Sequence, residues 1–454
     1  MKQLAQTLST VDYFVVGFGA MVGVGWLVVM DDWLQRGGPI GAVLGFLIGG
    51  VVLLPLGYVY ARLIMAIPDA GGEIAYTAQV FRRPVSFAAG WMMVLAYFVV
   101  CPWEGVAIGT LCSYIFPQLK SFELYRVAGQ SVYLPQLLIG IGLTAVLTWI
   151  NYRGVRISAA FQRGTTFALL ALFAIFALGG LTHGSRANLS PGFSYSSWVS
   201  VLLVVQIVPY FMTGFESVGK CAEEASPQFR NQGFYRAIMA SIVVSAIFYC
   251  LIIFVVGYAF PWRRLVAQPF ATAYALQQVV PGRWIVDLVL AGALFALLKV
   301  FNANFLAASR LVFAMGRRQM LHPQLAEISH ENQTPAAAVL LTGMLTVLGV
   351  FLGKAILIPV TEVGGLASAC GWLASSSVLF LIEKSFWPRT IALLGAAVSA
   401  ALIGIKVFPF VPGHFSAAEW IALALWIGLG LLVRRRPASA AAHSKPSAGG
   451  GPGS

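Results

Sequence analysis

Three charged residues, Glu104, Glu216 and Lys299, lie inside long apolar stretches of this 454-residue chain. An ion in the middle of a bilayer is costly unless it is paired or hydrated, so residues of this kind mark functional positions. Desolvation would let either carboxyl bind and release a proton near neutral pH, and Lys299 is a candidate counter-ion for both. We therefore expect proton transfer or amine binding at the two carboxyls.

Two apolar stretches contain residues that weaken a helix. Gly17–Gly25 holds four glycines, and Pro209–Glu216 combines a proline with a glycine. Each glycine costs about 1 kcal/mol against alanine in a helix, and proline removes a backbone donor. Irregular backbone at membrane depth is tolerated only where it lines a cavity or binds something. Because broken helices are typical of secondary transporters, we interpret both stretches as breaks. The alternative is that the glycines only allow close helix packing.

The composition indicates a membrane protein. The chain is 59% hydrophobic and 10% charged, with a mean hydropathy of +0.83, whereas soluble domains carry about 25% charged residues. Apolar runs long enough to span a bilayer recur along its length. We predict an all-α integral membrane protein with about twelve transmembrane helices, at 12–35, 39–63, 86–116, 133–151, 155–181, 198–222, 235–259, 284–314, 335–353, 356–383, 389–408 and 416–433.

The spacing of the two breaks indicates how the helices are organised. The breaks fall in spans one and six, as expected for an inverted repeat of two five-helix halves. The halves would cover residues 12–181 and 198–383, with the last two helices outside the repeat. Residues 1–436 would then form one transporter domain. The tail, 437–454, is rich in Ala, Ser, Gly and Pro; it is expected to be disordered and to end in a tag remnant.

The net charge of +13 does not indicate a nucleic-acid partner in such a chain. Lys and Arg concentrate in the cytoplasmic loops of membrane proteins. They are more frequent on the inner side if the N-terminus is inside, and Arg434–Arg436 follows the last span. We expect a multi-pass protein of the inner cell membrane with both termini in the cytoplasm. The five cysteines match no metal-site spacing, so no metal or cofactor is expected.

Several short motifs occur in an order that resembles the amino acid–polyamine–organocation (APC) superfamily of permeases, over about residues 10 to 435. They are Gly19–Gly25; Gly37-Gly38-Pro39; Pro68–Tyr76 with Gly90-Trp91; Asn151–Arg156; Gly214–Glu216 with Ala222–Glu224; and Ser309-Arg310 with Ala314-Met315. The chain departs from the family at three places. Val24 replaces a usual Ser or Thr, Arg62 replaces a frequent acidic residue, and Phe167–Phe173 lacks a lysine that some proton-coupled members carry.

The resemblance implies a LeuT-like fold with the substrate between the two breaks. Free amides and the helix dipole near Trp26 suit a carboxylate. Carbonyls near Thr213 and Gly214 would accept from an ammonium group, and Phe215 or Trp26 would cover the substrate. The predicted substrate-binding residues are Val22, Gly23, Val24, Gly25, Trp26, Glu104, Thr213, Gly214, Phe215 and Glu216.

Charged residues near the ends of the spans suggest gates. Glu73, with Arg82 and Arg83, is predicted to pair with the inner end of span six, where Glu223 and Glu224 lie. At the outer end of span one, Asp31, Asp32 and Arg36 fit interfacial solvation better than an outer gate. We further hypothesise that Lys299 replaces the missing fifth-helix lysine, at the place where sodium sits in sodium-driven relatives.

The sequence thus predicts a secondary active transporter that moves an amino acid, neutral or cationic, by alternating access with proton coupling. The alternatives are a permease for an organic amine or polyamine, and an amino acid/amine exchanger. A membrane enzyme is disfavoured, because all five histidines lie in predicted loops or the tail. No phosphate-binding Gly-x-x-x-x-Gly-Lys loop occurs, so ATP-driven transport is disfavoured too. The sequence gives no indication of an oligomeric state.

Overall fold

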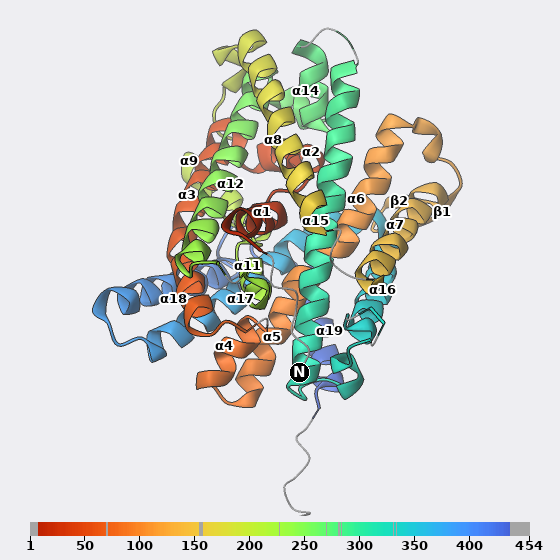
Figure 1. Ribbon diagram of the computed structural model, residues 1–454. Helices are drawn as coiled ribbons and strands as arrows, with labels where there is room; N and C mark the ends of the chain where they lie inside the picture. The colour runs from red at the N-terminus through yellow and green to blue at the C-terminus, as the bar shows by residue number, and fades with distance from the viewer. Residues whose placement is uncertain are drawn as a thin grey trace, which may run out of the picture.

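Helices occupy all twelve predicted segments of the chain (Figure 1). The computed structural model describes residues 8–435 except 70, 154–157, 227, 269, 280–281, 283, 330 and 333, so the predicted tail lies outside the described residues. Within the described residues, nine helical segments are long and apolar enough to cross a membrane, and three apolar helices are shorter. The predicted all-α architecture is confirmed.

The first predicted span, 12–35, is divided among two short helices and the start of a third. α1 (Thr10–Met21) and α2 (Gly25–Val28) are separated by Val22–Val24, and α3 (Met30–Ala66) continues the chain. Within α3, Gly38 has a φ of 65°, and the predicted second span begins at the next residue. A Cβ at Gly38 would lie 2.7 Å from the carbonyl oxygen of Gly192, so both the φ angle and the close contact require glycine here.

The other helices follow with mostly short connections. They are α4 (Glu73–Val80), α5 (Arg83–Phe98), α6 (Val100–Ile115), α7 (Leu134–Arg153), α8 (Ser158–His183), α9 (Ser197–Val205), α10 (Val208–Phe211), α11 (Ser217–Lys220), α12 (Gln232–Ala259), α13 (Trp262–Leu265), α14 (Ala271–Val279), α15 (Trp284–Arg317), α16 (Ala336–Val350), α17 (Leu357–Ile382), α18 (Phe386–Val407) and α19 (Ala417–Val433). Single 3-10 turns lie at η1 (Pro117–Leu119), η2 (Arg186–Leu189), η3 (Ala222–Glu224), η4 (Pro323–Ala326) and η5 (Gly353–Ile356).

A small hairpin, absent from the sequence prediction, connects α6 to α7. β1 (Glu123–Val127) and β2 (Gln130–Tyr133) pair antiparallel, with Val127 opposite Gln130. The two-residue turn Ala128-Gly129 has positive φ at both positions, as a tight hairpin turn requires. On this exposed hairpin, the Arg126 guanidinium holds the pKa of the Glu123 carboxyl below its usual value.

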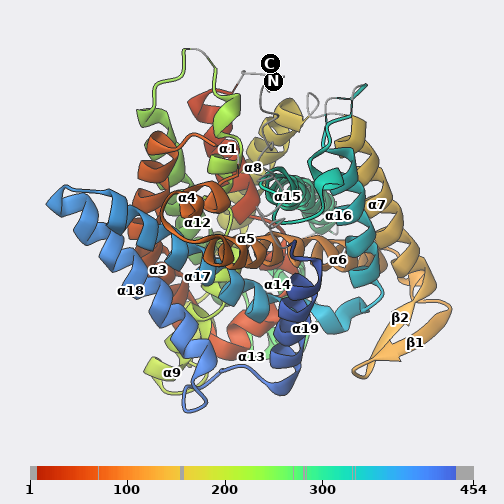
Figure 2. The ribbon, with the colours of Figure 1, turned by 90° about the horizontal axis from the view of Figure 1, so that it is seen from below.

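Two views show how the helices of the bundle are arranged. α7 and α18 lie on opposite sides of the bundle, and α15 passes near its centre (Figures 1 and 2). The core beside the breaks is aromatic: the Trp33 ring lies 4.8 Å from both the Phe46 and the Phe211 rings, and Tyr249 stacks on Phe46. These rings fix α3, α10 and α12 against one another.

Candidate functional site

The first break exposes backbone donors. α1 ends at Met21, and α2 begins at Gly25 after three residues outside the helix. In the described part of the chain, the amides of Val24, Gly25 and Trp26 meet no hydrogen-bond acceptor. A Cβ at Gly25 would lie 2.6 Å from Phe211, so a larger residue would force these two segments apart. These unpaired amides can bind an anionic group.

The second break lies directly against the first. Met212–Glu216 separates α10 from α11 and contains Gly214, whose φ is 133°. A Cβ at Gly214 would lie 2.8 Å from the backbone carbon of Ala20, so the two broken segments touch at this glycine. The Tyr249 hydroxyl of α12 donates to the Met21 carbonyl at 2.8 Å, with the Phe211 carbonyl 3.3 Å away. The prediction that spans one and six are broken is confirmed.

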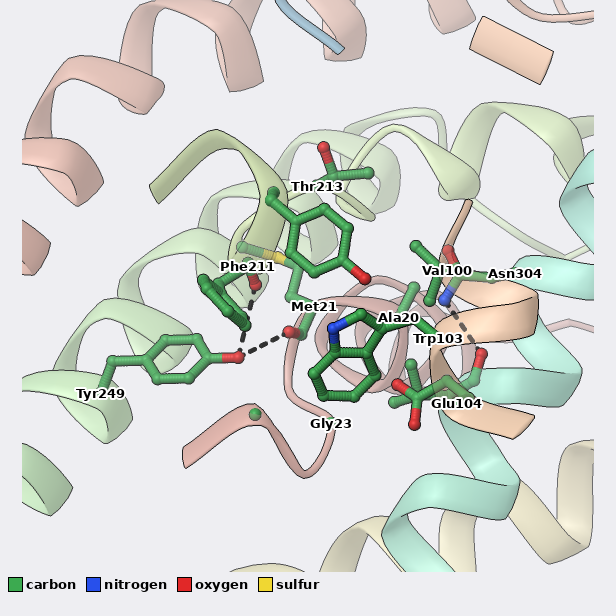
Figure 3. A pocket seen from close by; sticks show the side chains of 13 residues that line it. Ala20, Met21, Gly23, Val100, Trp103, Glu104, Phe211, Thr213, Tyr249 and Asn304 are labelled. Carbon is green, nitrogen blue, oxygen red and sulfur yellow. Dashed lines mark hydrogen bonds between the residues drawn. The ribbon is translucent and has the colours of Figure 1, made fainter. Parts of the chain in front are cut away.

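A small pocket, with a cavity volume of about 30 Å³, lies between the breaks. Figure 3 shows Tyr249 and Phe211 on one side of it and Glu104 and Asn304 on the other, with Gly23 between them. It is lined by Ala20, Met21, Gly23, Gly25, Val100, Trp103, Glu104, Tyr210, Phe211, Thr213, Tyr249, Val300 and Asn304.

The pocket wall opposite the breaks is rich in unused acceptors. Glu104 on α6 is 3% exposed, and its Oε2 has no hydrogen-bond partner in the described part of the chain. The Oδ1 of Asn304 on α15 also has no hydrogen-bond partner in the described part of the chain. The Tyr210 hydroxyl of α10, beside the second break, is likewise without a partner there. No described cation forms an ion pair with Glu104. A bound cationic group would satisfy these atoms.

Sequence reasoning identified four of the lining residues: Gly23, Gly25, Glu104 and Thr213. Val22, Val24, Gly214 and Glu216 are close to them in sequence but do not line this pocket. Sequence reasoning did not identify the aromatic residues that line the pocket, which are Trp103, Tyr210, Phe211 and Tyr249, and it did not identify Asn304. A signal in the sequence could have identified three of these aromatics. Trp103 is next to Glu104, and Tyr210 and Phe211 directly follow Pro209.

Neither of the two predicted covering aromatics, Trp26 and Phe215, lines this pocket. Trp26 instead lines a second, apolar hollow together with Phe173, Phe176 and Ile252. Phe215 is fully buried and packs against Tyr60 and Trp372. Trp26 lies in the four-residue helix α2, and Phe215 lies in the irregular segment between α10 and α11. Segments this short have no sustained helical period, so sequence spacing could not predict the direction of these side chains.

The carbonyl of Gly214 is not available to an ammonium group, contrary to the prediction. It accepts hydrogen bonds from the backbone amide and the hydroxyl of Ser217, at 2.9 and 2.5 Å. The Thr213 hydroxyl is also used, since it bonds to the Pro209 carbonyl at 2.7 Å and contacts Ser368. The acceptors that remain open lie mainly on the Glu104 side.

Lys299 is not the counter-ion of either carboxyl, so that prediction is wrong. It is fully buried, and its Nζ lies 3.4 Å from the Thr166 hydroxyl of α8 and 5.7 Å from the centre of the Phe18 ring of α1. In the described part of the chain no carboxylate pairs with it. Lys299 therefore reaches from α15 into the contact between α1 and α8.

The predicted gate residues do not pair as expected. Glu73 does meet the end of span six, but its partner is Lys220, with the Nζ and Oε1 atoms 2.6 Å apart and both side chains buried. Arg83 bonds to the backbone carbonyl of Gln319, and Glu223 lies 3.8 Å from Arg317. Glu216 remains buried, with its Oε2 accepting from the Gly214 amide at 3.0 Å.

Two of the three charges near the other end of the first span, Asp32 and Arg36, are paired rather than solvated, which corrects the interfacial interpretation for these two residues. Arg36 lies 2.8 Å from Asp32 and 2.9 Å from Glu362 of α17. Glu362 also pairs with the buried Lys406 of α18. Elsewhere in the described residues, no group of three or more His, Cys, Asp or Glu could hold a metal ion.

Comparison with known proteins agrees with this geometry. A family model described as amino acid permease matches residues 8–432. The chain is 24% identical to the methylthioribose transporter of Bacillus subtilis (strain 168), over 95% of this chain and 93% of that protein. It is 20% identical to the branched-chain amino acid permease BcaP of the same organism, with the same coverage.

A third relative is the cationic amino acid transporter 4 of Homo sapiens, which is 26% identical over 85% of this chain and 61% of that protein. The family and these relatives are transporters rather than enzymes. The match extends over nearly all of the described residues, including both broken segments and the pocket between them. The chain therefore belongs to the amino acid permease family within the APC superfamily.

Proposed function

We propose that this protein is a secondary active transporter that carries an amino acid across the inner cell membrane by alternating access, coupled to protons. The observation that supports it best is the pocket between the two breaks, with unpaired amides at Val24–Trp26 and an unpaired carboxyl at Glu104. A zwitterion needs one partner of each kind when it leaves water. Binding at mid-span between two broken helices is typical of such carriers.

The cargo we infer is an amino acid that presents a positive group to Glu104. The α-carboxylate would bind at the start of α2, and a cationic group would reach Glu104 Oε2 and Asn304 Oδ1. Two acceptors that converge on one pocket wall favour a donor-rich group such as an ammonium or guanidinium. The aromatic rings of Trp103 and Tyr210 would add cation–π contacts. A basic amino acid fits this arrangement better than a neutral one.

A second candidate cargo is an organic amine without a carboxylate. Its support is the position of Glu104 Oε1, which would lie only 3.3 Å from a Cβ built on Gly23. An ionised carboxyl so close to the break would repel the carboxylate of a substrate. Protonation of Glu104, or a cargo that carries only amines, would remove this repulsion.

Lys299 is the residue we assign to proton coupling. A buried ammonium without a carboxylate partner is expensive, so its protonation can depend on whether water reaches the contact between α1 and α8. Since α1 belongs to a broken span and contacts α8 and α15, a shift of α1 would change that access. This assignment retains the hypothesis that Lys299 replaces the missing lysine of the fifth span.

The orientation we propose places both termini in the cytoplasm. It rests on the excess of Lys and Arg in loops on that side, including Arg317, Arg318 and the run after α19. The end that carries α4, η3 and η4 would then face the cytoplasm.

Uptake into proteoliposomes tests the function. Purified protein should accumulate a labelled basic amino acid when the lumen is alkaline, and protein-free liposomes should not. Competition by amines and by neutral amino acids separates the two cargo candidates. Uptake that requires an internal amino acid and ignores the pH gradient would indicate an exchanger instead.

A further inference from the structure

A buried ion pair lies one helical turn beyond the second break. Lys220, at the end of α11, places its Nζ 2.6 Å from Glu73 Oε1 at the start of α4, and the two side chains are 1% and 0% exposed. The Tyr60 hydroxyl of α3 donates to the same oxygen at 2.9 Å, and the Ser375 hydroxyl of α17 donates to Tyr60 at 3.1 Å. Residues of α3 and α11 therefore bond directly to one carboxylate at the start of α4, and α17 is linked to it through Tyr60.

The backbone around the pair is shaped to accept the lysine. Gly72, which precedes α4, has a φ of 52°, and a Cβ there would lie 3.5 Å from Lys220 Nζ. Any other residue would be strained at this φ, and its Cβ would lie only 3.2 Å from Cε of Lys220. The Tyr97 ring lies 5.0 Å from the same Nζ, within cation–π range. Lys220 also donates to the Glu216 carbonyl at 3.3 Å, which links the pair to the second break.

This layer is imperfectly satisfied, although it is fully buried. In the described part of the chain, Glu73 Oε2, Glu216 Oε1 and the Tyr76 hydroxyl have no hydrogen-bond partner. The layer also contains two carboxyls, Glu73 and Glu216, but one ammonium. A buried polar atom without a partner destabilises the state that holds it. The unpartnered polar atoms of such a layer can form hydrogen bonds when water enters it, which they cannot do in a permanently dry core.

We propose that the Glu73–Lys220 ion pair is the lock that closes the α4 end of the pocket, and that it separates to admit water when the cargo leaves on that side. The proposal rests on the proposed transport cycle, but its test does not require a known cargo. It replaces the predicted pairing of Glu73, Arg83 and Glu223 with a pair that the structure brings together.

The residue after Lys220 provides a reporter of opening. Cys221 is 8% exposed, and its Sγ accepts from Arg310 at 3.3 Å. Its backbone carbonyl accepts from the Tyr13 hydroxyl of α1 at 2.9 Å, so it lies where α1 meets the end of span six. Separation of Lys220 from Glu73 would release this contact and expose the thiol.

The experiment measures alkylation of Cys221 in a variant whose other four cysteines (Cys101, Cys112, Cys250 and Cys370) are replaced by alanine. A membrane-impermeant maleimide is applied to either side of reconstituted vesicles without cargo. Glu73→Gln combined with Lys220→Met removes both charges and keeps similar volumes. We expect its alkylation from the α4 side to be roughly tenfold faster than in the parent, the change that about 1.4 kcal/mol of lost closure produces.

Two further variants separate a lock from a general loss of structure. Glu73→Lys with Lys220→Glu restores an ion pair in reverse and should return the rate toward the parent value. Arg62→Gln with Glu383→Gln removes a more exposed pair that also joins α3 to the end of α17, and should leave the rate unchanged. If the neutral pair does not fold, Tyr60→Phe, which removes only the hydroxyl from Glu73, should still raise the rate. Alkylation at the parent rate in the variants that fold overturns the proposal, whether or not any amino acid is transported.

Discussion

The Tyr249 hydroxyl lies 2.8 Å from the carbonyl oxygen of Met21, the last residue of α1 before the first break. The Phe211 carbonyl, at the end of α10 before the second break, is 3.3 Å from the same hydroxyl. One side chain of the unbroken helix α12 therefore holds both broken spans at a fixed separation. The pocket lies between these carbonyls and Glu104, so its width depends on this tyrosine.

Tyr249→Phe should widen the pocket without emptying the core. We expect a loss of about 1 kcal/mol in stability from the missing hydrogen bond, and weaker cargo binding because the breaks are less fixed. Thermal unfolding with and without cargo measures both effects. Tyr258→Phe on the same helix is the matched control, since its hydroxyl makes no hydrogen bond in the described part of the chain. Unchanged binding in Tyr249→Phe would contradict a role in holding the site.

Glu104→Gln should discriminate between cargoes by charge. The amide keeps the volume of the side chain but removes the charge that would face a cationic group. Hydrogen bonds to charged groups contribute about 1.5–3 kcal/mol, so the KM for a basic amino acid should rise on the order of 10- to 100-fold. The KM for a neutral competitor should change much less. Equal KM values for the basic substrate in the variant and the parent would remove Glu104 from the site.

The breaks could be predicted from sequence because their cause is local. Four glycines in Gly17–Gly25 and a proline with a glycine in Pro209–Glu216 weaken a helix whatever surrounds it. The spans followed from apolar length for the same reason. Glu104 could be identified because a carboxyl inside a membrane span is costly and is therefore seldom present without a functional or structural role.

The partners of the charges could not be predicted, because they depend on contacts between distant segments. Glu73 and Lys220 are 147 residues apart, and Asn151 is 151 residues from Asn302, to which it bonds. Lys299 lay on a correctly predicted helix, but the face it occupies turns it toward Thr166 rather than toward either carboxyl. Periodicity gives the face of a helix, while helix packing decides what that face meets.

Lys299→Met should uncouple uptake from the pH gradient. The thioether fills a similar volume but cannot bind a proton, so a role in coupling predicts that exchange persists while concentrative uptake is lost. Counterflow and pH-driven uptake into proteoliposomes measure the two activities separately. Thr166→Val, which removes the hydroxyl beside Lys299 but keeps the amine, should shift the pH profile without abolishing it. If the methionine variant still concentrates its cargo with the parent's pH dependence, the coupling residue lies elsewhere.

The ion pairs of α17 should differ in their contribution to stability according to their burial. Glu362 is 6% exposed and contacts both Arg36 and Lys406, so Glu362→Gln leaves Lys406 buried without a carboxylate. Breaking a buried pair in this way costs about 3–5 kcal/mol. Glu383 at the other end of α17 pairs with the more exposed Arg62, and Glu383→Gln should cost below about 1 kcal/mol.

Thermal unfolding in detergent would show this contrast as a large loss of Tm for Glu362→Gln and a small one for Glu383→Gln. Adding Lys406→Met to Glu362→Gln should recover part of the loss, because the stranded ammonium is then removed and Arg36 keeps Asp32. A double variant no more stable than Glu362→Gln alone would mean that shape, rather than the uncompensated charge, sets the energy at this junction. Recovery would show that the uncompensated ammonium of Lys406, rather than the loss of the Glu362 carboxylate itself, causes part of the instability.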